Sequence, residues 1–406
     1  MKLSFVALTA FALSTSIIDS DLLYAAEVNV DAAPFGMSRE QNAPLLRWGP
    51  VIIHPFLSLQ ETYSDNIYLT SDNKQHDFIT TVMPGVQFNL PFSRHQAYLF
   101  GSGTFINYAK YTAENTADWN VGAGGDFNFG SRINLKASDS YLDGHKPRSE
   151  SALGEVERFN NNNASASLSY VLGDISKLRL DYANADWKFK TNLFESRNEN
   201  TLSAYAYYRF LPKTSAFVEY EFKTVYFTDK TVGNYDNNAH SGLIGVTWKL
   251  SDYSQGTIKG GYQRKDFNDP SQVGFSGFVA SLDLAHRFSD YDSVKFTGAR
   301  TINETSLVGT SYSISTGLNG EYTHKFNDRL STSIKASFSN EEFSAIATGD
   351  SVKRTDQVVM AGANVRYLFR RWLESTLEYY WRQKNSNIDV YDSTENNVSM
   401  ALKAFF

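Results

Sequence analysis

The 406-residue sequence predicts an all-β protein: a single closed antiparallel transmembrane β-barrel of about 18 strands, with 16 as the alternative count. Three observations support this fold class. Long segments alternate between apolar and polar residues, short turns recur about every forty residues, and the chain ends on an alternating segment that stops at Phe406. Because side chains alternate between the two faces of a strand, each such segment has one apolar face.

The composition agrees with this fold class. The chain has no cysteine, which excludes disulfides and thiolate metal sites. Mean hydropathy is −0.37, although aromatic residues make up 15% of the chain. After the N-terminal region, no apolar run approaches the roughly 20 residues that a spanning helix needs. The net charge of −6 says little about nucleic acid, but the chain has no basic run of the usual kind, so no nucleic-acid partner is expected.

The N-terminus has the pattern of a secretory signal peptide. Lys2 supplies a positive end, an apolar stretch follows, and Ala25 and Ala26 mark the expected cleavage region. The next segment is irregular and contains three prolines, so we expect a periplasmic segment there, with a plug as the alternative. The predicted divisions are residues 1–26 for the signal peptide, 27–50 for the periplasmic segment and 51–406 for the barrel.

Eight short clusters of turn residues divide the rest of the chain. Two long segments lie in each interval, whereas a β-propeller packs four short strands into a similar repeat. Eight short turns join sixteen strands, and one strand precedes and one follows them, which gives 18. The predicted turns lie at residues 91–95, 130–131, 173–176, 211–214, 251–254, 289–293, 327–328 and 370–371.

The alternating segments between the turns are long enough to cross a membrane. The first is predicted at residues 53–68, and others include 118–129, 312–326 and 359–369. Longer polar connections at the other end predict extracellular loops, opposite short periplasmic turns. These loops are expected at residues 71–76, 143–161, 192–199, 228–238, 267–274, 340–354 and 385–394.

The first predicted strand also carries a family resemblance. It contains ETYSDNIY at residues 61–68, followed by Pro84-Gly85 and by LPFSR at residues 90–94. These stretches resemble a family of bacterial outer-membrane β-barrel porins, several of them encoded with exopolysaccharide synthesis and export systems. The resemblance implies an outer-membrane conduit with a polysaccharide as its cargo, and it supplies no catalytic residues.

Alternation places a set of basic residues on the inner face near the periplasmic ends of the strands. A ring of cations there would attract anions and slow cations. The alternative is a salt-bridged wall, because Asp181, Glu219, Glu221, Asp283 and Glu321 are also predicted to face inward. The predicted basic residues are Arg132, Lys177, Arg179, Arg209, Lys249, Arg287, Lys325, Arg366 and Lys403.

Aromatic residues are also predicted on the inner face, where their rings could stack on sugars. The alternatives are a surface that packs against a plug, or a β-bulge that reverses the assigned faces. The residues in this prediction are Phe105, Tyr111, Tyr205, Tyr207, Phe217, Phe227 and Tyr380.

Catalytic chemistry has little support in the sequence. His240-Ser241, near Asp236, is the only combination that suggests a hydrolase, but adjacent strand residues point to opposite faces. No histidine pair has helical metal-ligand spacing, and the Asp- and Asn-rich loops lack the twelve-residue calcium pattern. We therefore predict no catalytic residue, no metal and no cofactor.

The predicted function is a pore in the outer membrane of a Gram-negative cell. The cargo hypothesis is a polysaccharide, and the alternative is general diffusion of small solutes. An enzyme at the rim and a structural or adhesive barrel are further alternatives. Expected partners are outer-membrane lipid, an anionic saccharide polymer and periplasmic export components; the oligomeric state is left open.

Overall fold

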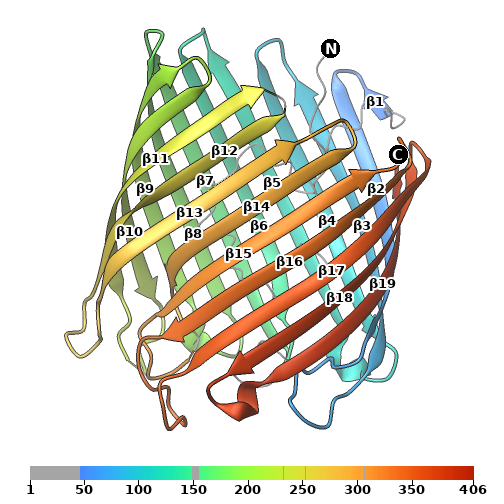
Figure 1. Cartoon of the computed structure of the whole chain (residues 1–406), viewed down its shortest axis with the longest axis vertical. Coiled ribbons are helices and arrows are strands. Elements are labelled where there is room, and N and C mark those ends of the chain that lie inside the picture. Colours follow the sequence, from blue (N-terminus) through green and yellow to red (C-terminus); the bar gives the residue numbers. More distant parts are fainter. Residues whose placement is uncertain (1–45, 149–154, 232, 252, 306) are drawn as a thin grey trace.

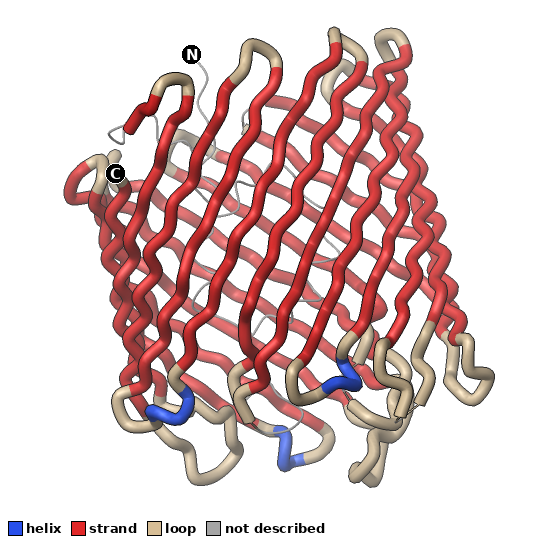
Figure 2. Tube along the Cα trace, turned by 180° about the vertical axis from the view of Figure 1, so that it is seen from behind, coloured by secondary structure: helices blue, strands red, loops and turns tan. Residues whose placement is uncertain are grey.

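The computed structural model describes residues 46–148, 155–231, 233–251, 253–305 and 307–406. These residues form one antiparallel sheet that closes into a barrel (Figures 1 and 2). Eighteen long strands, β2 to β19, make the barrel, and each pairs with the next along the chain. The last strand pairs with β2, where Phe405 lies opposite Phe56. The predicted fold class and strand number are confirmed.

The strands of the first half of the chain are β1 (Leu46–Trp48), β2 (Val51–Ser64), β3 (Asp77–Pro91), β4 (His95–Tyr108), β5 (Thr116–Phe129), β6 (Ile133–Lys146), β7 (Glu157–Leu172), β8 (Ser176–Phe189), β9 (Arg197–Leu211) and β10 (Thr214–Phe227). Those of the second half are β11 (Asn237–Ser251), β12 (Ser254–Phe267), β13 (Phe275–Arg287), β14 (Asp292–Asn303), β15 (Ser313–Lys325), β16 (Leu330–Phe343), β17 (Thr355–Arg370), β18 (Leu373–Ser386) and β19 (Ser393–Phe405). Within the described residues, three 3₁₀ segments lie in connecting loops: η1 (Thr112–Glu114), η2 (Leu193–Glu195) and η3 (Asp389–Tyr391).

The two ends of the barrel differ in their connections. All eight predicted short turns lie at one end, where β2 begins and β19 ends. The longer loops lie at the other end and contain the three 3₁₀ segments, drawn in blue in Figure 2. This difference is typical of outer-membrane barrels, with short periplasmic turns and longer extracellular loops.

Local chemistry explains several of the turns. Gly130 and Gly173 have φ angles of +69° and +61°, which a residue without Cβ adopts at little cost. In the turn after β15, the Asn327 side-chain oxygen accepts the backbone N–H groups of Arg329 and Leu330 at 2.8 and 3.0 Å. These side-chain hydrogen bonds satisfy backbone N–H groups of the turn that make no strand-to-strand bond, and they stabilise the turn.

The outer face of the barrel is mainly apolar. On β9, Leu202, Tyr208 and Phe210 are exposed, and alanines occupy the outward positions between them. Leu202 to Phe210 spans about 26 Å along the strand at ~3.3 Å per residue. A tilt of about 40° reduces this to about 20 Å across the membrane, close to the height of an apolar barrel band. No helix within the described ranges is long and apolar enough to span a membrane.

Several predicted boundaries were wrong. The first long strand ends at Ser64, so residues 65–68 belong to a loop. Two extracellular loops, 109–115 and 304–312, were not predicted. The second of them contains Leu307 and Val308 and resembles a strand. The short strand β1 was also missed; it pairs with the start of β2. The predicted signal peptide and most of the predicted periplasmic segment lie outside the described residues.

Candidate functional site: the pore lining

The barrel interior is lined mainly by polar side chains, because every second residue of each strand points inward. On β19, Val398 and Met400 are exposed on the outer face, while Glu395 and Asn397 are buried inside. The same inner face continues on β2, because Asn397 lies opposite Ser64 in the strand pairing. The Ser64 hydroxyl donates to Glu395 at 3.0 Å. A polar interior at this strand number is typical of a barrel with an aqueous channel.

Most of the predicted basic residues lie on inward-facing positions near the short-turn end. On β8, Lys177 and Arg179 alternate with the exposed, outward-facing Leu178 and Leu180. Arg132 differs because it lies in the turn between β5 and β6, where strand alternation does not fix its direction. The other inward-facing members of the set are Arg209, Lys249, Arg287, Lys325, Arg366 and Lys403.

Several of these cations have a partner on the barrel wall. Arg179 Nε lies 3.0 Å from Asp181, and Arg366 Nε donates to Glu374 at 2.9 Å. Arg287 lies 4.0 Å from Asp290 in the adjacent turn. Lys177 and Lys403 lie against aromatic rings, and Arg209 donates to the Asp174 carbonyl. The ion pairs of Arg179, Arg287 and Arg366 favour the salt-bridged alternative for these three residues. The aromatic rings and the carbonyl are neutral partners, so those contacts hold the other side chains in place without compensating their charge.

Two of the predicted cations remain open to the lumen. Lys249 and Lys325 have exposed side chains at the periplasmic ends of β11 and β15. Within the described part of the chain, neither forms an ion pair. Arg132 is also exposed, in its turn. These residues leave net positive charge at the periplasmic mouth, so the predicted ring is reduced to a few residues.

Deeper in the lumen, the predicted acidic residues contribute to wall contacts. Glu219 accepts a hydrogen bond from the Tyr205 hydroxyl at 3.0 Å and lies 2.8 Å from Lys259 Nζ. Lys259 is on β12 and Glu219 on β10, so this ion pair crosses the intervening strand. Arg179 and Asp181 continue the network on β8. The network is a structural part of the wall.

The predicted aromatics of β9 and β10 form one buried cluster, with Tyr205, Tyr207 and Phe217 in contact. The Arg179 guanidinium lies 3.9 Å from the centroid of the Tyr205 ring. The Lys177 ammonium lies 4.2 Å from that of Tyr207. Cations therefore already lie over these rings, which reduces the surface that a sugar could use.

The other predicted aromatics have different surroundings. Tyr380 faces inward and is buried, and Phe227 packs among loop-end residues with Phe194 and Tyr235. Phe105 was assigned to the wrong face: it points outward and packs edge-on against Trp119, which is 52% exposed. The error arose because β4 carries glycines on its outer face and aromatics on its inner face. Tyr111 lies beyond β4, in the loop.

One of the unpredicted loops, 304–312, is attached to the extracellular part of the pore lining. Glu304 forms an ion pair with Lys265 of β12, and both side chains are almost fully buried. Asn237 Nδ2 donates to Glu304 at 3.2 Å. The Gly309 N–H donates to the Tyr235 hydroxyl at 3.3 Å. Periodicity could not reveal this contact, because it joins a loop to two separate strands.

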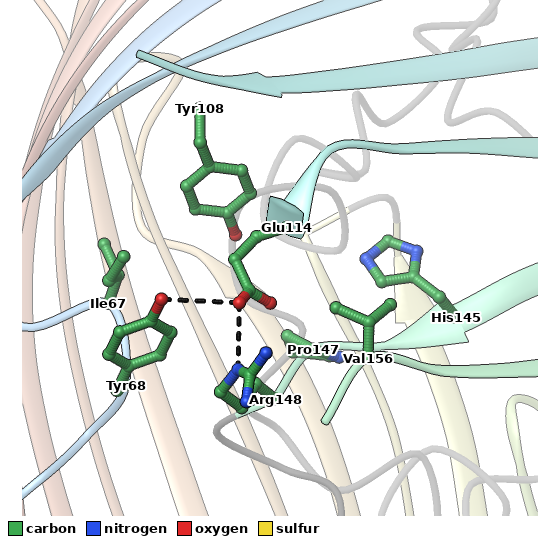
Figure 3. A pocket seen from close by; sticks show the side chains of 8 residues that line it. All are labelled: Ile67, Tyr68, Tyr108, Glu114, His145, Pro147, Arg148 and Val156. Atoms are coloured by element: carbon green, nitrogen blue, oxygen red, sulfur yellow. Dashed lines mark hydrogen bonds and ion pairs between the residues drawn. The ribbon is translucent and has the colours of Figure 1, made fainter. Parts of the chain in front are cut away.

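A second loop contact joins three extracellular loops around a cavity of about 10 Å³ (Figure 3). The Glu114 carboxylate accepts hydrogen bonds from the Tyr68 hydroxyl at 3.3 Å and from Arg148 Nε at 2.8 Å. Burial, and then the neighbouring Glu114 charge, raise the pKa of the Tyr68 phenol. The cavity holds at most about one water molecule, and the bonds of Glu114 connect the loops around it.

The candidate hydrolase residues do not come together. His240 is on the outer face, where its Nδ1 lies 2.8 Å from the Tyr220 hydroxyl. Ser241 is buried on the inner face, and the Asp236 carboxylate bonds the Phe227 N–H and Lys230. Among the described residues, no group of three or more potential ligands could hold a metal ion.

A model of the family described as "Putative beta-barrel porin 2" matches residues 46–406. The chain belongs to this porin family. This confirms the resemblance seen in the sequence. The protein is therefore an integral outer-membrane β-barrel porin.

Solved structures resemble this porin at low sequence identity. The outer membrane protein opdK from Pseudomonas aeruginosa is 9% identical, with a TM-score of 0.48 over 87% of this chain and 98% of that chain. OccAB4 from Acinetobacter baumannii is 11% identical, with a TM-score of 0.48 and the same coverage. A bacterial polysaccharide outer membrane secretin is 11% identical, with a TM-score of 0.36 over 87% and 98% of the chains. No curated protein matches the porin.

Proposed function

We propose that this porin is a conduit through which an anionic polysaccharide leaves the cell. The observation that carries the proposal is the positive charge at the periplasmic mouth. Lys249 and Lys325 face inward there, are exposed, and have no ion-pair partner among the described residues. Uncompensated cations at the entrance raise the local concentration of an anionic polymer on the side from which it would arrive.

The lumen deeper in the barrel suits passage of such a polymer. Its charged side chains are largely paired with one another, as in Lys259–Glu219 and Lys335–Glu378. Paired charges bind an anionic chain only weakly, and conduction requires that cargo both enter and leave. The short periplasmic turns would be the surface that meets periplasmic export components.

General diffusion of small solutes is the second candidate. The same ion-paired wall favours it, because a wall with few unpaired charges discriminates little among small solutes. The two candidates differ in their cargo and require different physiological tests.

Deletion of the gene in its native host tests the proposal. We expect loss of surface polysaccharide, retention of polysaccharide in the periplasm, and unchanged uptake of small solutes, all restored by the wild-type gene. Surface polysaccharide would be measured by labelling of intact cells. Unchanged surface polysaccharide together with reduced solute uptake would contradict export and favour general diffusion.

A further inference from the structure

Charge is unevenly distributed around the lumen. On β2 to β7, the charged inward residues lie within the first or last four positions of their strands, as Asp126 and Lys136 do. The middle of this wall is uncharged. On several of the remaining strands, among them β10, β12 and β16, mid-strand inward positions carry charges: Glu219, Lys259 and Lys335. Representative uncharged inward residues of this wall are Gln60, Ser102, Asn120 and Ser138 in its middle, with Asn89 and Tyr98 nearer the short turns.

The uncharged wall is bordered by β8 and β19 and faces the later strands of the chain across the lumen. In Figure 1, the uncharged wall is the blue-to-green set of strands at the rear, and the yellow-to-red strands lie in front. A chain in the lumen would therefore pass between an uncharged surface and a surface of ion pairs.

Several hydrogen bonds in the middle of the uncharged wall join neutral side chains of the same or adjacent strands. Gln60 Nε2 donates to Thr62 Oγ1 at 3.0 Å, and the Ser138 and Ser165 hydroxyls lie 2.8 Å apart. Neutral hydrogen bonds of this kind contribute little net free energy, so a solute hydroxyl can replace one partner at small cost. Ion pairs are held more firmly, because separating them leaves an uncompensated charge.

Tyr98 provides a flat aromatic surface on this wall. A Cβ placed on Gly124 would lie 2.4 Å from the Tyr98 hydroxyl oxygen and 2.6 Å from Cζ, so the ring lies across β5 where the glycine leaves room. The neighbouring Phe100 ring is nearly parallel to it, at an interplanar angle of 23°. Tyr98 is only half-buried, whereas the Tyr205 ring of the charged side is covered by Arg179.

We propose that the uncharged wall is a binding surface for the neutral pyranose units of a saccharide chain. The Tyr98 ring stacks on the apolar face of a sugar ring, while amides such as Gln60 and Asn120 exchange hydrogen bonds with sugar hydroxyls. This inference rests on the proposed function, because it names the surface that would guide the saccharide. It does not depend on the cations at the mouth.

Channel block by a neutral oligosaccharide tests the surface. Purified full-length porin in planar bilayers would be titrated with maltohexaose, and the half-blocking concentration read from the ion current. We expect block of the wild type, and a half-blocking concentration about fivefold higher for Tyr98→Leu and for Asn120→Leu, since each loses about one contact. Asn319→Leu, at an inward position of β15 on the charged side, is the matched control and should leave block unchanged.

Each variant must first show the wild-type ion conductance without sugar, which verifies folding. Absence of block in the wild type, or block unchanged in both Tyr98→Leu and Asn120→Leu, would overturn the proposal. Equal weakening by Asn319→Leu would also overturn it. Loss of export on deletion combined with unchanged block in the variants would reject this surface alone. Normal export on deletion combined with weakened block would reject the export function and leave the surface standing.

Discussion

Individual charges in the lumen fall into two groups. Arg179 and Arg366 are held by Asp181 and Glu374, so their charges are largely compensated. Lys249 and Lys325 are exposed and have no such partner among the described residues. Because uncompensated charges set the potential at a pore entrance, the second group contributes directly to ion preference.

Reversing these two charges should therefore change selectivity. We expect the double variant Lys249→Glu, Lys325→Glu to lower the anion-to-cation permeability ratio at least about twofold. Reversal potentials across planar bilayers under a salt gradient would measure it. Lys188→Glu, on the outer face near the extracellular end, is the control and should have the wild-type ratio. An unchanged permeability ratio in the double variant would show that Lys249 and Lys325 do not set the ion preference.

The buried Lys265–Glu304 pair carries a different prediction. Replacing Glu304 with Gln leaves the Lys265 charge buried without its partner, so we expect the free energy of unfolding to fall by about 3–5 kcal/mol. Urea unfolding of the barrel in lipid vesicles would measure this change. Adding Lys265→Met to Glu304→Gln should recover part of the loss. A single variant as stable as the wild type would show that the loop is not held by this pair.

At the scale of the strand, the pairing of β19 with β2 closes the sheet. Ser399 lies opposite Thr62, and both side chains face the lumen. Without this pairing, both strands would present unpaired edges, which lipid does not tolerate.

The absence of native cysteine allows a direct test of this pairing. We expect Thr62→Cys and Ser399→Cys to form a disulfide in isolated outer membranes, because directly opposed residues on one face meet its geometric limits. Non-reducing gel mobility would detect the bond. Glu61→Cys with Ser399→Cys is the control, and its side chains point to opposite faces. Equal disulfide formation in both pairs would indicate a different register.

Strands and turns were the part of the fold most accessible from the sequence. Turn positions follow from local chemistry, as the Asn327 side-chain bonds show. The face of a strand follows from polarity only where that polarity alternates. On β4 it does not, so Phe105 was assigned inward although it packs against Trp119 outside. Loop contacts such as Glu304 to Lys265 depend on three-dimensional proximity and have no sequence signal.

At the scale of the whole molecule, alternation identified the inward residues but not how they group across the lumen. The Lys259–Glu219 pair skips a strand, and the cations over Tyr205 and Tyr207 come from β8. Because of such contacts, most of the predicted basic and aromatic residues are structural parts of the barrel wall. They also distinguish that side from the uncharged wall around Tyr98.

The central claim is that this porin encloses a water-filled channel through the outer membrane. The most direct test is the current through purified full-length protein in planar bilayers. We predict discrete stepwise increases in conductance and a reversal potential that shows preference for anions. Folded, membrane-inserted protein that produces no conductance steps, or that prefers cations, would contradict this account.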